Sequence, residues 1–280
     1  ELVEMGIVDG WDDPRMPTLC GLRRRGYTPT SIFTFVREAG ISKSDNLIDM
    51  RQLEACIRSE LDLTAQRRIA VLDPVKLVID NYPEDQVEYL DVENNQENEE
   101  LGSRKVAFSK YLYIEREDFM EEPPKKYFRL FPGNEVRLKN AYFVKCVGFE
   151  KDEDGNVTTV HCTYDPETRS GSGFEGRKVK GTIHWVSAES AIDAEVRLYE
   201  NIIDEEKGKL NDDGTLNLNP NSLVIKQGCK LEKAFEEAQP GEAFQFLRNG
   251  FFCVDSKDST AEHPVYNRIV SLKSSYKPGK

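Results

Sequence analysis

A change in hydrophobic period near Ala65 is the feature that most constrains the fold of this chain. Before it, apolar residues recur every three or four positions over 30–39, where Gly40 ends the run, and over 50–61, where Asp49 precedes it. This spacing places apolar side chains on one face of a helix. After Ala65 the apolar runs are short and bounded by turn residues, as is typical of strands. Residues 1–64 are therefore predicted to form a helical unit and residues 65–280 a β-rich region.

The β-rich region is predicted to contain many short strands. Pro74 interrupts the first apolar run, 69–79, so this run is split into two strands or lies at a sheet edge. The sequences Asp154-Gly155-Asn156 and Asn249-Gly250 lie between strand patterns and are typical of hairpin turns. Further strands are expected at 110–114, 135–138, 142–149, 156–164, 178–186, 222–225, 244–246, 251–255 and 268–271. The expected fold is mainly β with an N-terminal α unit: a small helical subdomain followed by two antiparallel β-barrels.

Three segments depart from the strand pattern. Segments 81–101 and 202–221 are polar and acidic, so they are expected to be surface loops, the first a candidate for disorder. In segment 187–201, Ala191, Ala194 and Leu198 share one helical face with Ile202, which predicts a helix.

The net charge of −12 at first argues against a nucleic-acid partner, because a negative surface repels a polyanion. Much of this charge is local, however. Positions 81–100 hold eight carboxylates and no Lys or Arg. A basic face elsewhere on the protein is therefore still compatible with the net charge. Binding of RNA or DNA depends on the charge of such a face rather than on the net charge.

Cysteine and histidine spacing argues against a metal centre or a disulfide framework. The six cysteines are scattered without a Cys-x-x-Cys pair, and there are only three histidines. No run of about eighteen apolar residues predicts a membrane span. The sequence starts at Glu1 without a secretion signal, so reduced cysteines, a cytoplasmic location and no membrane partner are expected.

The stretch 10–29 combines helix punctuation with a cluster of positive charge. Asp13 before Pro14 and Thr18 are predicted N-caps, and Gly26 is predicted to end the second of these helices. Three arginines then spread around the helix end: Arg23, Arg24 and Arg25. From composition alone this is a capped turn with a solvated basic end.

The same stretch resembles a known family. Gly-Trp-Asp-Asp-Pro-Arg-Met-Pro-Thr over 10–18, followed by Gly-Leu-Arg-Arg-Arg-Gly-Tyr over 21–27, is similar to the segment that follows the KMSKS-type loop in class I glutaminyl-tRNA synthetases and their eukaryotic and archaeal glutamyl relatives. Further similar stretches occur in the same order at 70–79, 102–104, 135–142, 162–165, 177–188, 222–228, 244–246, 255–256 and 267–268. The resemblance covers nearly the whole chain and implies a stem-contacting helical subdomain at 1–64. It also implies anticodon-binding barrels of the ribosomal-protein type within 65–280, in motif blocks 65–165 and 177–272.

The resemblance also implies which side chains read the anticodon of a bound tRNA. Arg67, Gln245 and Arg248 match the pocket for the middle base, and Arg137 and Lys139 match the pair facing the first base. Arg129, with Lys126, matches the site for the third base. A weak contact with the tRNA stem is expected from Arg23, Arg24 and Arg25. Such side chains can read splayed single-stranded bases.

Three positions depart from the family pattern. Lys139 stands where relatives commonly have arginine, which keeps the charge but loses the planar fork. Phe128 stands where lysine is familiar, and Leu247 replaces an acidic residue, so the third-base site is the least secure.

The predicted site residues are also compatible with positions that have no role in binding. Arg67 beside Arg68 is also consistent with a solvated linker. The remaining strand residues, Arg137, Lys139 and Gln245, are also consistent with ordinary outward positions.

The leading hypothesis is the tRNA stem-binding and anticodon-binding region of a glutamine-tRNA ligase. Neither the HIGH nor the KMSKS signature of the family is present, and the resemblance places the KMSKS-type loop before Glu1, so the chain is predicted to be inactive alone. ATP and Mg would belong to the full enzyme, with no cofactor or metal site in this part.

The expected partners are the glutamine tRNA and the enzyme's own N-terminal catalytic domain, in a monomer. A eukaryotic or archaeal glutamyl-tRNA synthetase, or a non-enzymatic RNA-binding β-barrel module, remains an alternative. An independent hydrolase or transferase is least favoured, because no nucleophile–base pair or phosphate loop is found.

Overall fold

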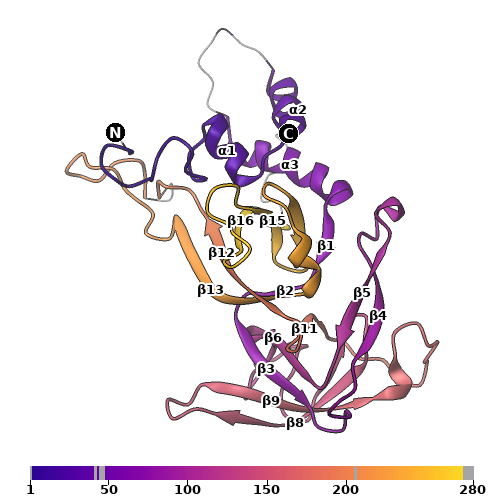
Figure 1. Cartoon of the computed structure of the whole chain (residues 1–280). Coiled ribbons are helices and arrows are strands. Elements are labelled where there is room, and N and C mark those ends of the chain that lie inside the picture. The colour runs from indigo at the N-terminus through magenta and orange to yellow at the C-terminus, as the bar shows by residue number, and fades with distance from the viewer. Residues whose placement is uncertain (1, 41–42, 44–47, 205–206, 274–280) are drawn as a thin grey trace. The chain divides into compact units, whose positions relative to one another are not determined.

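The computed structural model describes residues 2–40, 43, 48–204 and 207–273 (Figure 1). The chain divides into two compact units, each assembled from separate segments. The first unit contains residues 1–67, 195–227 and 238–280, and the second contains residues 68–194 and 228–237.

The described part of the first unit contains three α-helices: α1 (Leu19–Arg25), α2 (Pro29–Ala39) and α3 (Met50–Thr64). Their caps follow the sequence signals. The hydroxyl oxygens of Thr18 and Thr28 accept hydrogen bonds from the backbone amides of Gly21 and Ser31, and Asp49 caps α3 in the same way. Gly26 ends α1 with a φ of 105°. A Cβ atom placed on residue 26 would lie 2.6 Å from the Cβ of Cys253. Gly26 is therefore required both by conformation and by close packing.

Replacing Thr18 by alanine is expected to cost about 1 kcal/mol of unfolding free energy, because the Gly21 amide loses its side-chain acceptor at 2.9 Å. Urea unfolding of the variant and the parent, with the slopes compared, measures this cost. Substitution by serine keeps the acceptor and is the matched control. Equal midpoints for the alanine variant and the parent would contradict the assigned cap.

The predicted N-cap at Asp13 is wrong. The first helix begins at Leu19, and residues 13–15 form a turn. Asp13 instead accepts hydrogen bonds from the backbone amide of Arg15 at 2.9 Å and from its guanidinium at 2.7 Å. The same guanidinium donates to the carbonyl of Ile7 at 3.1 Å. The Asp13 carboxylate therefore binds the Arg15 guanidinium instead of capping a helix.

The helices complete one hydrophobic core with late strands of the same unit. Figure 1 shows α1 and α3 next to β15 (Gly250–Val254) and β16 (Val265–Val270). The buried cluster contains residues from both ends of the unit: Leu22, Tyr27, Leu53, Ile57, Leu61, Ala65, Phe251, Cys253, Ile269 and Val270. The helical part therefore shares its core with strands that are far away in sequence.

The sheet of the first unit runs in the order β1-β14-β15-β16-β12-β13. Its other strands are β1 (Gln66–Arg68), β12 (Ile192–Tyr199), β13 (Leu223–Leu231) and β14 (Ala243–Phe246). Strands β14, β15 and β16 pair antiparallel, whereas β12 pairs parallel with β16. The last residues of β13 belong to the second unit, where they pair with β2 (Ala70–Val71).

The second unit contains a seven-stranded sheet in the order β10-β7-β8-β9-β3-β6-β11 and a two-stranded ribbon. The sheet strands are β3 (Pro74–Ile79), β6 (Tyr111–Glu115), β7 (Glu135–Leu138), β8 (Phe143–Lys151), β9 (Val157–Asp165), β10 (Thr182–Ile183) and β11 (Trp185–Ser187). Strands β4 (Glu88–Glu93) and β5 (Ser103–Phe108) form the ribbon. Four 3-10 helices complete the described elements: η1 (Glu99–Leu101), η2 (Arg116–Asp118), η3 (Pro166–Thr168) and η4 (Lys233–Glu237).

The prediction of a mainly β fold with two barrels is confirmed. The two large sheets are nearly closed and barrel-like. Among the described strand pairings, those of β3 with β9, β7 with β10 and β12 with β16 are parallel, so the sheets are mixed rather than wholly antiparallel. Both predicted hairpin turns join antiparallel neighbours, β8 to β9 and β14 to β15.

The helix predicted over 187–201 is wrong. Most of this segment is strand β12, which pairs with β16 through Glu195 opposite Val265. Ala194 and Val196 are buried, as is Glu195 between them, and the β-branched Ile192 and Val196 suit an extended chain. Tertiary pairing therefore overrides the helical spacing.

The acidic segment 81–101 is ordered over part of its length, contrary to its prediction as a loop and a candidate for disorder. Strand β4 pairs with β5, and its Leu90 and Val92 are buried while carboxylates occupy alternate positions. The Glu88 carboxylate also accepts hydrogen bonds from the hydroxyls of Tyr82 and Tyr142, at 3.0 and 2.9 Å. The alternation of apolar and acidic residues thus specifies a strand with one face inward.

A buried carboxyl makes the second unit sensitive to acid. Burial alone would raise the pKa of Glu115, but the His184 ring nitrogen at 3.2 Å and the amides of Leu72 and Asp73 outweigh it and hold the pKa at about 2. The stabilising contribution is thus complete above the unfolded pKa of 4.5 and is lost as the pH falls toward 2.

Thermal unfolding of the parent at pH 5 and pH 3 is expected to show this loss. A Glu115→Gln variant should show a smaller difference between the two pH values, because its side chain does not titrate. An equal difference in both proteins would contradict the role of Glu115.

No helix in the described ranges is long and apolar enough to cross a membrane. Within the same ranges, no group of three or more His, Cys, Asp and Glu side chains could hold a metal ion.

Candidate functional site

Two unpartnered polar atoms lie on neighbouring strands of the first unit. Arg67 is in β1, and Gln245 is in the adjacent strand β14. The Nε of Arg67 and the Oε1 of Gln245 are both buried, and neither has a hydrogen-bond partner within the described chain. A buried polar atom without a partner costs about 1 to 3 kcal/mol. A ligand that carries both an acceptor and a donor can satisfy these two atoms once neighbouring side chains move to admit it, because both atoms are covered in the free chain.

Local sequence explains the position of Gln245. Phe244 and Phe246 are buried on either side of it, so strand alternation turns the amide to the opposite face of the sheet. Arg248 follows in the turn between β14 and β15. It is exposed and has a φ of 69°, a left-handed conformation that is uncommon for a residue with a side chain. The three residues predicted for the middle base thus come from β1, β14 and one hairpin turn.

Arg137 has no carboxylate partner among the residues that the structure describes. One guanidinium nitrogen donates to the Thr168 carbonyl at 3.1 Å and the Ser170 hydroxyl at 3.0 Å, and the group lies 4.2 Å from the centroid of the Phe143 ring. Burial lowers the pKa of Arg137, and no carboxylate in the described ranges offsets this effect. The side chain is therefore held in place while its charge remains available to an electron-rich ligand.

Lys139 lies two residues further along the chain, beyond the end of β7. Its backbone is fixed, because its amide donates to the Ile183 carbonyl and its own carbonyl accepts from the Trp185 indole, both at 2.9 Å. Its side chain is half-buried, and no ion pair of its ammonium occurs within the ranges that the structure describes. Within the described part of the chain, Arg137 and Lys139 therefore provide two positive charges that no carboxylate pairs with.

Arg129 differs from Arg137 because acidic side chains already neutralise it. Its guanidinium lies 2.9 Å from the Glu117 carboxylate and 3.2 Å from that of Asp118. Lys126 is exposed and has a φ of 71°. The predicted third-base residues thus carry less free positive charge than the predicted first-base pair.

The predicted basic cluster at the end of α1 is largely internal, so the solvated basic end is wrong for two of its three arginines. Arg24 is buried and pairs with the Asp255 carboxylate at 3.0 Å. Arg25 is buried and donates to the carbonyls of Arg268 and Ile269. Arg23 is exposed and is the one of the three that remains accessible for a stem contact.

Sequence reasoning missed the groups around Arg137. Phe143 lies directly opposite it in the pairing of β7 with β8. Arg177 lies 5.3 Å from the same ring and pairs with Glu135 at 2.6 Å and Asp165 at 2.8 Å. Recognising a tight turn at 139–142 would have placed Phe143 beside Arg137, because that turn fixes the register.

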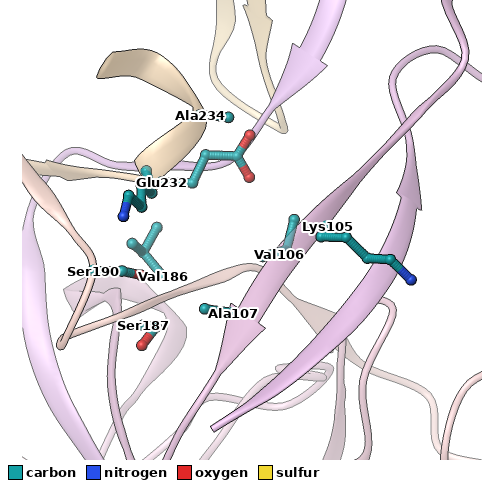
Figure 2. A pocket seen from close by; sticks show the side chains of 9 residues that line it. Lys105, Val106, Ala107, Val186, Ser187, Ser190, Glu232 and Ala234 are labelled. Atoms are coloured by element: carbon teal, nitrogen blue, oxygen red, sulfur yellow. The ribbon is translucent and has the colours of Figure 1, made fainter. Parts of the chain in front are cut away.

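Sequence reasoning also missed a buried ionic cluster in the second unit. Glu232 lies 2.7 Å from Arg104 and 3.7 Å from Arg68. Figure 2 shows the Glu232 side chain beside a small cavity that is also lined by Ser187 and Lys105. The cavity volume of about 20 Å³ matches one water molecule, so this cavity does not hold a nucleobase.

Family models of known proteins match three parts of the chain. Two family models described as "tRNA synthetases class I (E and Q), anti-codon binding domain" match residues 65–165 and 182–255. A third, described as "tRNA synthetases class I (E and Q), catalytic domain", matches residues 1–63.

Several similar curated proteins carry the name glutamine–tRNA ligase. The relative from Clostridium perfringens is 57% identical over 99% of this chain and 50% of its own length. Relatives from Clostridioides difficile and Vibrio vulnificus are 55% and 49% identical, over 100% and 99% of this chain and 51% and 50% of their own lengths. The chain thus spans about half the length of the curated relatives it matches.

Proposed function

The chain belongs to the class I tRNA synthetases for glutamate and glutamine, and from this premise we propose that it is the stem-binding and anticodon-binding region of a glutamine-tRNA ligase. In this proposal, residues 1–64 face the tRNA stem and residues 65–280 hold the anticodon loop, in motif blocks 65–165 and 177–272. Glutamine is favoured over glutamate because the similar relatives are named as glutamine–tRNA ligases.

The observation that carries the proposal is the open donor and acceptor on Arg67 and Gln245. An unstacked base presents both kinds of group on its Watson–Crick edge, so it can satisfy both atoms at once. Arg248, in the adjacent turn, completes the proposed contact with the middle base. A base that pairs with both atoms removes the free-energy cost of leaving them unpaired. A base with a different arrangement of donors and acceptors does not, so the site selects the first base over the second.

Four cations of the second unit support the proposal for the other two bases. Arg137 and Lys139 are proposed to contact the first base, and Arg129 with Lys126 the third. Arg129 already forms ion pairs with Glu117 and Asp118, so its contact with the third base is expected to be weaker than the contacts with the first base. Arg23 is the accessible candidate for the stem.

The whole protein is proposed to attach glutamine to its tRNA with ATP and Mg. The chain described here supplies recognition and acts with the catalytic domain of the same polypeptide, as a monomer in the cytoplasm. Anticodon contacts would influence the distant reaction through their different strengths in two conformations of the enzyme.

A titration of the chain with glutamine tRNA, and with the same tRNA carrying an altered middle anticodon base, tests the proposal. Tighter binding of the native tRNA is expected, with a difference that persists from low to moderate salt because base contacts release few counterions. Equal binding that disappears as salt is added would show phosphate contact alone and overturn base recognition by this chain.

A further inference from the structure

Phe128 presents a half-exposed aromatic ring beside the proposed third-base residues, with 49% of the residue accessible. It lies between Lys126 and Arg129 in the loop that precedes β7. Burying this ring against an apolar or aromatic surface would remove apolar area from water. The position is therefore unfavourable for the free protein and suited to a ligand with a flat face.

The backbone under this ring is held from both sides. The Tyr127 hydroxyl donates to the Glu117 carbonyl at 3.0 Å, and the side-chain amide of Asn134 donates to the Arg129 carbonyl at 2.7 Å. The Leu130 amide donates to the Asp118 carbonyl at 2.9 Å. Phe128 is thus an exposed ring on a loop whose backbone is held by hydrogen bonds. Less conformational entropy of the loop is therefore lost when a ligand packs against the ring.

A second segment approaches Phe128 through Gly181. A Cβ added at residue 181 would lie 1.8 Å from the Phe128 carbonyl oxygen, so only glycine permits this approach. The approach places the Lys180 ammonium 5.4 Å from the centroid of the Phe128 ring. The Gly181 carbonyl also accepts from the Arg137 amide at 2.9 Å. One glycine therefore joins the Phe128 loop to the strand that carries the proposed first-base residue.

Exposed lysines lie close in sequence to the Phe128 ring and to Gly181, among them Lys180 at the ring itself. Lys125, Lys126, Lys178 and Lys180 are all exposed and come from these two segments, in a chain whose net charge is −12. Aromatic rings set among cations bind single-stranded nucleic acids, because each base stacks while its phosphate is attracted. The surrounding lysines thus select a nucleotide over an uncharged aromatic ligand.

We propose that Phe128, with Lys180 beside it, stacks on one unpaired base of the bound RNA, the third base of the anticodon. The proposal rests on the function proposed above. It makes third-base binding in this chain depend on stacking, with Arg129 partly neutralised by Glu117 and Asp118. Stacking tolerates different bases, so it contributes affinity more than selectivity at this position.

The test uses the 280-residue chain and an anticodon stem-loop RNA of glutamine tRNA. Phe128→Ala is expected to weaken binding about 5- to 150-fold, the range for one stacked base, and this loss should persist in added salt. Phe128→Trp should retain affinity, whereas Phe128→Leu, which keeps apolar volume without a ring, should lose most of it. Lys180→Gln should weaken binding mainly at low salt.

An RNA with an abasic third position supplies the matched control. The parent and Phe128→Ala should bind this RNA equally, since no base remains to stack, and thermal unfolding checks that the variant is folded. Equal binding of the intact RNA by both proteins, with the parent still preferring it over a scrambled loop, would overturn the stacking site and leave the proposed function standing. A parent that does not distinguish the native from the scrambled loop would overturn the proposed function itself.

Discussion

Replacing Asp255 by alanine is expected to lower the unfolding free energy of the chain by about 3 to 5 kcal/mol, the range for breaking a buried ion pair. The Asp255 side chain has no solvent exposure, and its partner Arg24 is 8% exposed. The carboxylate also accepts from the amides of Lys257 and Asp258 at 2.8 and 2.7 Å, and from the Asn267 side chain. Alanine would leave a guanidinium and several donors buried without this acceptor.

The pKa of Asp255 agrees with this dependence. Burial alone would raise the pKa, but hydrogen bonds from the Asp258 amide, Asn267, the Lys257 amide and Arg24 outweigh it and hold the pKa below its usual range. Urea unfolding measures the loss. Asp258→Ala is the matched control, because Asp258 pairs with the same arginine at 2.8 Å but is 38% exposed, so its loss should stay below about 1 kcal/mol. A cost for Asp255→Ala no larger than for Asp258→Ala would contradict the assigned role.

Substitution of Arg67 by alanine is expected to reduce discrimination of the middle anticodon base by about 1 to 3 kcal/mol, or roughly 5- to 150-fold, by analogy with side-chain contacts to base edges. The guanidinium carries the unpartnered buried Nε, so its removal takes away one of the two groups proposed to recognise that base. The measured quantity is the ratio of dissociation constants for altered and native tRNA. Equal weakening toward both tRNAs would show that Arg67 contacts phosphate.

Two further variants separate recognition from general charge. Arg116→Ala removes an exposed arginine that pairs with Asp73 at 3.4 Å, so it should leave the ratio unchanged. Gln245→Ala should lower the ratio, and the double variant with Arg67→Ala should lower it by less than the sum of the two single effects, because both side chains serve one base. Additive losses would place the two residues on different parts of the RNA.

The sequence predicts most of the local structure because the deciding signals are local. Thr18, Gly26 and Asp49 mark helix ends, and Asn249-Gly250 marks a hairpin, through side-chain and backbone preferences that act within a few residues. Strand β12 was mistaken for a helix because its partner β16 lies far along the chain. Pairing with a distant strand leaves no trace in a short window of sequence.

For the candidate site too, the sequence indicates local features but not contacts between distant segments. Family resemblance identified Arg67 and Gln245, but their unpartnered buried atoms depend on how β1 and β14 pack. The internal use of Arg24 could not be predicted from its neighbours, because Asp255 is remote in sequence. Phe128 was recognised as a departure from the family pattern, whereas Lys180 beside its ring required the close approach at Gly181.

The core shared by α1, α3, β15 and β16 has a consequence for synthesis on the ribosome. The helices are made first, yet Leu22, Ile57 and Leu61 must wait for Phe251 and Ile269 before their apolar faces are covered. Chains generally fold domain by domain as they emerge, and exposed apolar surface promotes aggregation in the interval. The first-made segment of this chain is therefore among the last to become stable, and a translation stop before β16 would release helices without their core.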